Sequence, residues 1–75
     1  MFITITIESG GAYADIRIDS EQHIGMGLKV LRESGVMPFG DVPDYYRSGL
    51  SEKIVSAYKT FHDEGIFDGD VLSGV

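Results

Sequence analysis

Few residues in this sequence stand at spacings that support catalysis or metal binding. The two histidines, His23 and His62, lie far apart, and neither has a second His or Glu at the spacing that places two zinc ligands on one helix. We therefore expect both to be surface residues in contact with water. No serine lies in a Gly-x-Ser-x-Gly or Ser-x-x-Lys motif, and the chain has no cysteine to act as a nucleophile.

Carboxylates gather in the C-terminal third of the sequence, at Asp63, Glu64, Asp68 and Asp70. Oxygen atoms of this kind are the ligands that calcium prefers, but an Asp-x-Asp-x-Asp-Gly loop is missing from the sequence. A solvated acidic rim is therefore the expected structure here, and no metal site is predicted.

A stretch at residues 25–27, Gly-Met-Gly, begins like a phosphate-binding Gly-x-Gly-x-x-Gly loop. Val30 stands where the third glycine belongs, and no strand leads into the stretch at the right distance. A domain of this size also lacks the concave volume that most active sites need. The sequence thus predicts a protein that is not an enzyme and that takes no cofactor.

The composition restricts the partners and the compartment. The chain has 75 residues and a formal net charge of -6, which predicts one domain, residues 1–75, that repels nucleic acid and anionic membranes alike. No apolar run approaches the roughly 20 residues of a membrane span, so no membrane insertion is expected. Cysteine is absent, as in proteins of reducing compartments, and we expect a cytoplasmic protein.

Residues 1–19 predict a β-hairpin. Apolar side chains alternate along both halves, at Met1, Ile3, Ile5 and Ile7 and again at Ala14, Ile16 and Ile18. A strand places alternate side chains on opposite faces, so each half has one apolar inner face. Gly10 and Gly11 stand between the halves and supply the positive φ of a tight turn. We expect two antiparallel strands.

The period changes after residue 19, and the next stretch predicts an amphipathic helix that packs on the hairpin. Ile24, Leu28 and Leu31 recur at helical spacing. Met26 and Val30 are expected to widen this apolar stripe. The helix should therefore bury a broad face against the sheet.

The ends of this helix also have sequence signals. Asp19 or Ser20 is expected as the N-cap, and Gly35 as the stop after the last turn. Gly25 and Gly27 are unfavourable in a helix interior. We therefore expect these two glycines to mark a close approach of the helix to the sheet.

The rest of the chain predicts short strands and one turn of helix. Two prolines and a glycine make residues 36–43 an irregular connection. Strands are expected at 45–47, 53–56 and 70–73, a turn at 48–52, and a helical turn at 59–64 whose Phe61 points inward. With the hairpin and the helix, this order predicts an α+β fold, a mixed sheet of four to five strands with one crossing helix.

This order of elements is that of the ubiquitin-like β-grasp fold, and short motifs strengthen the resemblance. The stretch from Thr60 to Ile66, followed by Asp-Gly-Asp-Val-Leu at 68–72, resembles the Gly-Ile and Gly-Asp segment of ubiquitin-like domains. Residues 45–47, 53–56 and 69–72 resemble more narrowly the YukD and EsaB group, small bacterial ubiquitin-like proteins associated with type VII secretion. The resemblance covers nearly the whole chain.

The resemblance implies binding without a covalent bond to the partner. Conjugating ubiquitin-like proteins and sulfur carriers end in a flexible Gly-Gly tail, whereas this sequence reads Ser-Gly-Val at 73–75. The implied role is a non-conjugating protein-protein interaction module, a cytosolic accessory or regulatory component of a type VII secretion system. Its partner would be a secretion-system ATPase or membrane scaffold. The alternative is a β-grasp sulfur or acyl carrier activated at its C-terminus.

The aromatic residues suggest where a partner binds. Tyr45 and Tyr46 are adjacent on a strand, so one of them must point away from the helix. Tyrosine and arginine are enriched at interfaces, and the outer sheet face is the usual docking surface of ubiquitin-like folds. We therefore hypothesise that Phe2, Tyr46 and Arg47 bind a protein partner. Self-association through an edge strand is a further possibility.

Overall fold

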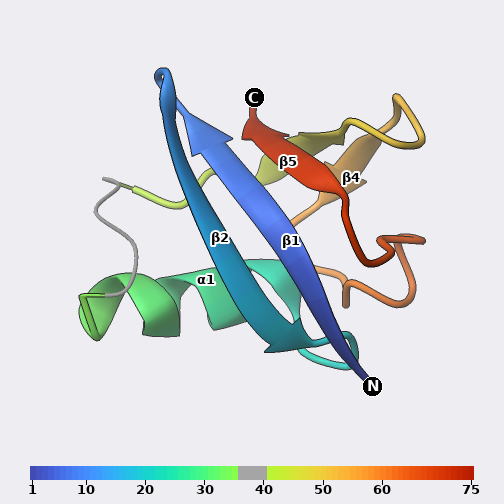
Figure 1. Cartoon of the computed structure of the whole chain (residues 1–75), viewed down its shortest axis with the longest axis horizontal. Helices are drawn as coiled ribbons and strands as arrows, with labels where there is room; N and C mark the ends of the chain where they lie inside the picture. The colour runs from blue at the N-terminus through green and yellow to red at the C-terminus, as the bar shows by residue number, and fades with distance from the viewer. Residues whose placement is uncertain (36–40) are drawn as a thin grey trace.

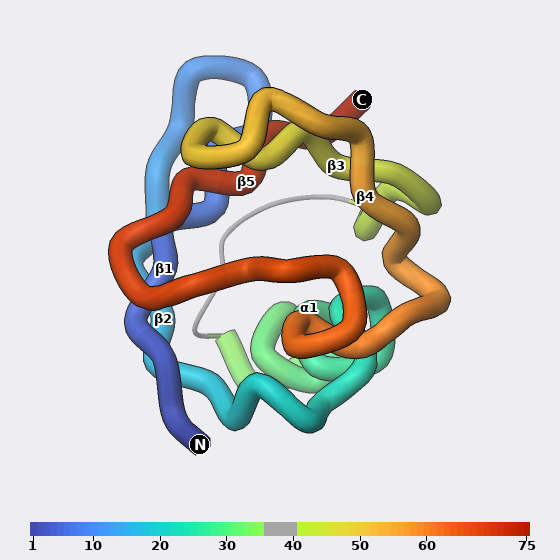
Figure 2. The backbone as a smooth tube through the Cα atoms, turned by 90° about the vertical axis from the view of Figure 1, so that its right-hand side faces the viewer, coloured from blue at the N-terminus to red at the C-terminus, as the bar shows by residue number. Residues whose placement is uncertain are grey.

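The computed structural model describes residues 1–35 and 41–75, which form five strands and one helix. In chain order these are β1 (Phe2–Ser9), β2 (Ala12–Asp19), α1 (Ile24–Glu33), β3 (Tyr45–Ser48), β4 (Ile54–Ser56) and β5 (Val71–Gly74). The strands make one mixed sheet in the order β2-β1-β5-β3-β4, with β1 and β5 parallel and the other neighbours antiparallel (Figure 1). The sheet curves around α1 (Figure 2). The predicted α+β fold is confirmed.

The β1–β2 hairpin forms because the two turn glycines and the alternation of apolar and polar side chains in both strands favour the same structure. Gly10 and Gly11 have φ values of 58° and 86°, as a two-residue hairpin turn requires. The pairing then runs without interruption from Ser9 and Ala12 at the turn to the far ends of both strands. The alternate isoleucines of both strands are buried in the core: Ile3, Ile5, Ile7, Ile16 and Ile18.

Met1 departs from the predicted inner face and is largely exposed. It precedes β1, which begins at Phe2, and its side chain is 82% exposed. Its carbonyl still accepts the Ser20 N–H at 2.8 Å, which continues the hairpin pairing by one position.

The start of α1 is capped by backbone groups of a distant segment. His23 is the N-cap and makes no side-chain capping hydrogen bond. The Ile24 N–H donates to the Lys59 carbonyl at 2.9 Å, and the Gly25 N–H donates to the Ala57 carbonyl at 2.7 Å. These contacts satisfy N–H groups that have no partner within the helix. Tertiary contacts therefore fix where the helix begins.

The prediction of Asp19 or Ser20 as the N-cap is wrong. Asp19 is the last residue of β2, and its carboxylate accepts the Glu21 N–H at 3.1 Å in a turn before the helix. This hydrogen bond and that from the Met1 ammonium lower the pKa of Asp19. Since the folded pKa is lowered, the contribution to stability is present near neutral pH and is lost as the pH falls through that pKa.

The apolar stripe of α1 is narrower than predicted. Ile24 and Leu28 are fully buried and Leu31 packs against them, as expected. Met26 and Val30 are more than half exposed, so the prediction that they widen the buried stripe is wrong. At about 100° per residue, these two positions lie on the side of the helix opposite Ile24 and Leu28.

The two glycines of α1 lie where the helix closely approaches other parts of the chain; at Gly27 the neighbour is Ile18 of the sheet, as predicted, whereas at Gly25 it is Ala57 in the segment after β4. A Cβ at Gly25 would lie 3.0 Å from the Ala57 carbonyl oxygen and 3.2 Å from Ala57 Cβ. A Cβ at Gly27 would lie 2.7 Å from Cδ1 of Ile18 and 2.8 Å from Cγ of Gln22. The space for a side chain at Gly25 is therefore limited mainly by the backbone of Ala57, and the space at Gly27 by the side chains of Ile18 and Gln22.

We expect Gly25→Ala to lower the free energy of unfolding by about 1–2 kcal/mol, although alanine favours helix by about 1 kcal/mol. The Ala57 carbonyl cannot retreat without loss of its hydrogen bond from the Gly25 N–H. Gly27→Ala should cost less, because the ends of Ile18 and Gln22 can rotate. Urea denaturation measures both variants, and a Gly25→Ala protein as stable as wild type would contradict the close contact.

The segment between β4 and β5 closes one end of the core. Phe61 is fully buried, which confirms its predicted inward direction, and Ile66 is buried beside it in the same core. The Thr60 hydroxyl accepts the Asp63 N–H at 3.0 Å and so caps this turn. Of the predicted irregular connection at 36–43, residues 36–40 lie outside the described residues.

The predicted acidic rim is wrong for Asp70, which is buried, whereas Asp63 and Asp68 are exposed as expected and Glu64 is half-buried. Asp70 is only 1% exposed and accepts hydrogen bonds from Ser48 Oγ at 2.6 Å, and from the Leu50 and Val71 N–H groups at 3.1 and 2.8 Å. Asp68 accepts the Thr4 N–H and Glu64 the Ser56 N–H, both at 2.7 Å. These carboxylates tie loops to strands because they accept backbone N–H groups that otherwise have no partner.

Candidate protein-binding surface

The face of the sheet opposite α1, here called the outer face, is not covered by any described element (Figure 1). Because side chains alternate along each strand, the residues next to buried ones point to this face. Its exposed apolar side chains come from all five strands: Phe2 of β1, Tyr13 of β2, Tyr45 of β3, Ile54 of β4 and Val71 of β5. The outer face is therefore a surface on which another protein can pack.

Of the three residues predicted to bind a partner, two lie on the outer face. Phe2 is 59% exposed, and the Arg17 guanidinium lies 5.4 Å from the centre of its ring in a cation–π contact. Arg47 is also exposed and makes no ion pair with any residue in the described ranges. Protein binding by these two residues stays a prediction.

The predicted outward placement of Tyr46 is wrong. Tyr46 is 2% exposed and belongs to the core, and its burial raises the pKa of the phenol to about 12. The neighbouring Tyr45 takes the outward position instead. The alternation of β3 required that one tyrosine point outward but did not say which one, and the pairing of β3 with β5 decided it.

Phe2 and Arg47 do not form one patch. Arg47 is paired with Ser73 of β5, and Ser73 is paired with Glu8 of β1. Phe2 lies six positions before Glu8 along the same strand, which corresponds to about 20 Å. A single small contact would not reach both residues.

The strand pairing surrounds Arg47 with other side chains. A row across the outer face runs Tyr13, Glu8, Ser73, Arg47, Ile54 in successive strands. Val71 lies two residues before Ser73 on β5 and is also partly exposed. We call the set Glu8, Tyr13, Arg47, Ile54 and Val71 the Arg47 patch. The sequence did not single out Ile54, because Ile54 and Val55 are both apolar and only the structure shows that Val55 is the buried one.

The Arg47 patch combines exposed apolar area with one accessible cation. Glu8 is the nearest carboxylate in the row, but Ser73 separates it from Arg47 by two strand spacings, about 10 Å. The guanidinium is therefore available to a carboxylate of a partner, with which it can form two parallel hydrogen bonds. The patch fits an acidic and partly apolar protein surface.

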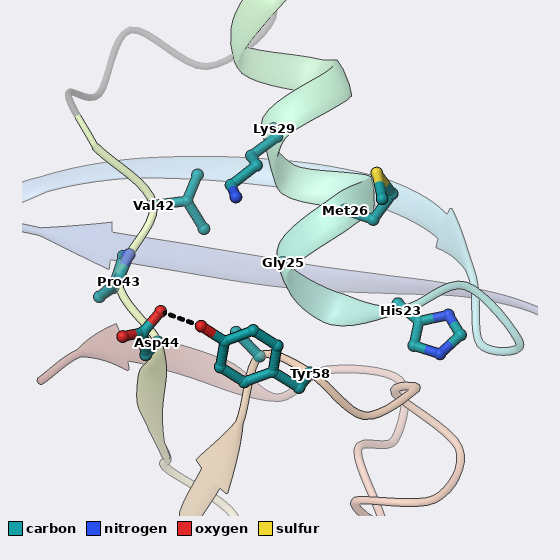
Figure 3. Close-up of a pocket in the computed structure, with 9 residues that line it drawn as sticks. His23, Gly25, Met26, Lys29, Val42, Pro43, Asp44 and Tyr58 are labelled. Atoms are coloured by element: carbon teal, nitrogen blue, oxygen red, sulfur yellow. Dashed lines mark hydrogen bonds between the residues drawn. The ribbon is translucent and has the colours of Figure 1, made fainter.

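A shallow pocket of about 280 Å³ lies beside the start of α1 (Figure 3). The residues that line it are His23, Gly25, Met26, Lys29, Val42, Pro43, Asp44, Ala57 and Tyr58. The Tyr58 hydroxyl donates a hydrogen bond to Asp44 at 2.9 Å, and this contact raises the pKa of the phenol. The sequence did not predict this pocket, since residues from three distant segments form it.

The described residues contain no cluster of metal-ligating side chains. Within residues 1–35 and 41–75, no group of three His, Cys, Asp or Glu side chains could hold a metal ion. His23 and His62 are both exposed and make no contact with each other. In the same part of the chain, no helix is long and apolar enough to cross a membrane.

The last residues of the sequence are part of the sheet. Gly74 lies in β5 opposite Tyr46, and the Val75 N–H donates to the Tyr45 carbonyl at 3.1 Å.

The comparisons with known proteins agree with this architecture. Neither a protein-family model nor a curated protein matches the sequence. The chain superposes on the ubiquitin-like domain of EccD5 from Mycobacterium xenopi with a TM-score of 0.59 and 19% identity, over 97% of this chain and 91% of that one. It superposes on the UBL domain of Plasmodium falciparum Dsk2 with a TM-score of 0.60 and 19% identity, over 97% of both chains. The chain therefore has the ubiquitin-like β-grasp fold.

Proposed function

We infer that this chain is a non-catalytic protein-protein interaction module. The observation that carries this proposal is the Arg47 patch, an exposed apolar cluster on a sheet face that no described element covers, with a cation that makes no ion pair within the described residues. Arginine and large apolar residues contribute much of the binding energy at interfaces.

The proposed setting is a type VII secretion system in the cytoplasm, with the chain as an accessory or regulatory component. Two observations support it: the short motifs shared with the YukD and EsaB group, and the likeness in fold to the ubiquitin-like domain of EccD5. The proposed partner is a secretion-system ATPase or a membrane scaffold of the system. Its contact surface should carry carboxylates that pair with Arg47.

We expect Arg47→Glu to weaken binding to the cytosolic part of this ATPase at least tenfold, a change of about 1.4 kcal/mol, because the new carboxylate repels an acidic partner. Ile54→Asp should have a similar effect by removing apolar contact area. Isothermal titration with the purified ATPase domain measures both. Lys59→Glu is the matched control, since it makes the same charge change at an exposed site outside the outer face.

The possible outcomes test the Arg47 patch and the assignment to type VII secretion separately. Unchanged affinity in both variants, with a native circular dichroism spectrum, would show that the Arg47 patch is not the binding surface. If wild type bound neither the ATPase nor the scaffold, the type VII assignment would fail. If the wild type then bound a different protein, and Arg47→Glu abolished that binding, the chain would still be an interaction module, but outside type VII secretion.

A further inference from the structure

Strand β2 forms one border of the sheet, and its outer side is open. In Figure 1 no strand lies beyond it, and the strand order places it last. It is eight residues long, whereas β4 at the opposite border has three. Its pairing with β1 is uninterrupted from Ala12 to Asp19, so it has no bulge, and it has no proline or lysine. Bulges, prolines and lysines are among the features that usually prevent an edge strand from pairing with another strand, and β2 lacks all three.

The hydrogen bonds of the hairpin show which backbone groups point to this open side. Ser20 donates to the Met1 carbonyl, so this pair is hydrogen-bonded within the hairpin. Because the pattern alternates along an antiparallel pair, the even-numbered residues of β2 bond to β1. Tyr13, Asp15 and Arg17 direct their N–H and C=O groups away from β1. In the described part of the chain, no strand pairs with them.

We propose that a second copy of this chain binds here, with the two β2 strands antiparallel and related by a two-fold axis at Ile16. The sheet then continues through both copies. Both sides of the junction contribute odd-numbered residues, so Asp15 of one copy and Arg17 of the other form a hydrogen-bonded pair. The interface is the same on both copies, as two-fold symmetry requires.

Opposite charges and the length of the pairing together favour this register, since an axis at Ala14 would pair only residues 12–16 of β2 and would place no opposite charges together. With the axis at Ile16, each Asp15 lies opposite an Arg17, and this happens twice. An axis at Asp15 or at Arg17 would place like charges directly opposite each other, which is destabilising. An axis at Ile18 would keep an Arg17–Asp19 pair but would pair only residues 17–19 of β2.

The side chains at the junction already have the conformations that this register needs. Asp15 accepts a hydrogen bond from Thr6 Oγ1 at 2.6 Å, and Arg17 lies over the Phe2 ring. Both are therefore held on the outer face of their own sheet, where strand pairing brings the opposite charge of the other copy. On the inner face, Ile16 of one copy lies opposite Ile16 of the other, which extends the apolar side of the sheet. The proposal does not depend on the Arg47 patch.

A charge-exchange experiment tests the pairing on the whole chain. Sedimentation equilibrium over a range of concentrations should show a monomer–dimer equilibrium for wild type. Asp15→Lys alone and Arg17→Glu alone should each weaken the dimer about tenfold or more, because two attractive pairs become two repulsive ones. An equimolar mixture of the two variants should dimerise as wild type does, since every charge then faces its opposite. The double variant should also recover the dimer.

Matched controls exclude effects of net charge and of folding. Asp63→Lys and Lys59→Glu make the same charge changes at exposed sites away from β2 and should leave the equilibrium unchanged. Recovery in the mixture shows that both variants fold. A wild type that stays monomeric at about 1 mM, or a mixture that stays monomeric, would overturn the proposal.

The register can be tested separately by disulfide cross-linking. The chain has no cysteine of its own, so a single introduced cysteine can pair only with the same position of another copy. Ile16→Cys should form a disulfide between copies under mild oxidation, since the two Cα atoms would be about 4.5 Å apart, within the range of disulfides. In this register the two Arg17 positions are diagonal neighbours about 7–8 Å apart, so Arg17→Cys should cross-link much more slowly. Faster cross-linking at Arg17 than at Ile16 would overturn the register.

Discussion

Replacement of Asp70 by alanine is expected to lower the free energy of unfolding by about 3 kcal/mol. The buried carboxylate accepts hydrogen bonds from Ser48 Oγ and from the N–H groups of Leu50 and Val71, and so holds the turn after β3 against the start of β5. The variant would leave these donors without their acceptor, and each donor that stays buried costs about 1–3 kcal/mol. Part of this cost is recovered where water reaches the Leu50 N–H.

Two variants serve as comparisons for Asp70→Ala, all measured by urea denaturation. Asp63→Ala removes an exposed carboxylate from the same region of the sequence and should change stability by less than about 0.5 kcal/mol. Asp70→Asn keeps one acceptor oxygen and should fall between the two. If Asp70→Ala were as stable as Asp63→Ala, the buried hydrogen bonds would not contribute to stability as we argue.

Phe61→Ala is expected to cost about 3–5 kcal/mol and to leave much of the protein unfolded at room temperature. Phe61 is fully buried in the core, its N–H donates to the Gln22 carbonyl, and its carbonyl accepts the Ile66 N–H. A chain of this length has a total stability of about 4–11 kcal/mol, so the loss of one large core side chain removes much of it.

The chain supplies a close control for this variant in Phe67, six residues further on. Phe67 is 67% exposed, so Phe67→Ala should change the free energy of unfolding by less than about 0.5 kcal/mol. Thermal unfolding followed by circular dichroism measures both variants. Similar melting temperatures for the two would show that Phe61 does not fill the core.

Local sequence patterns were sufficient to predict the elements of this fold. The alternation of isoleucine with polar residues predicted β1 and β2, and the glycine pair between them predicted the turn, because these features act within a few residues. Helical spacing of Ile24 and Leu28 predicted α1 for the same reason. The order of these elements along the chain resembled that of ubiquitin-like domains, a fold that the solved structures confirm, whereas the strand order within the sheet came only from the structure.

The site was predicted less well, because its residues come together across strands. The sequence indicated an outward tyrosine in β3 but not that it is Tyr45, since alternation is the same whichever of the two faces is buried. Ile54 and Tyr13 joined Arg47 only through the register of neighbouring strands. Phe2 was grouped with Arg47 by residue type, although the sheet separates them.

The sequence alone thus determined which segments become strands or helix and which side chains are apolar, because backbone preference and side-chain period are local properties. Tertiary structure decided which polar groups are buried and where elements begin. Asp70 became a buried acceptor and Ala57 and Lys59 capped α1, since each found hydrogen-bond partners far away along the chain. Such partners exist only after the sheet has closed around the helix, and the Arg47 patch and the open edge of β2 depend on the same strand order.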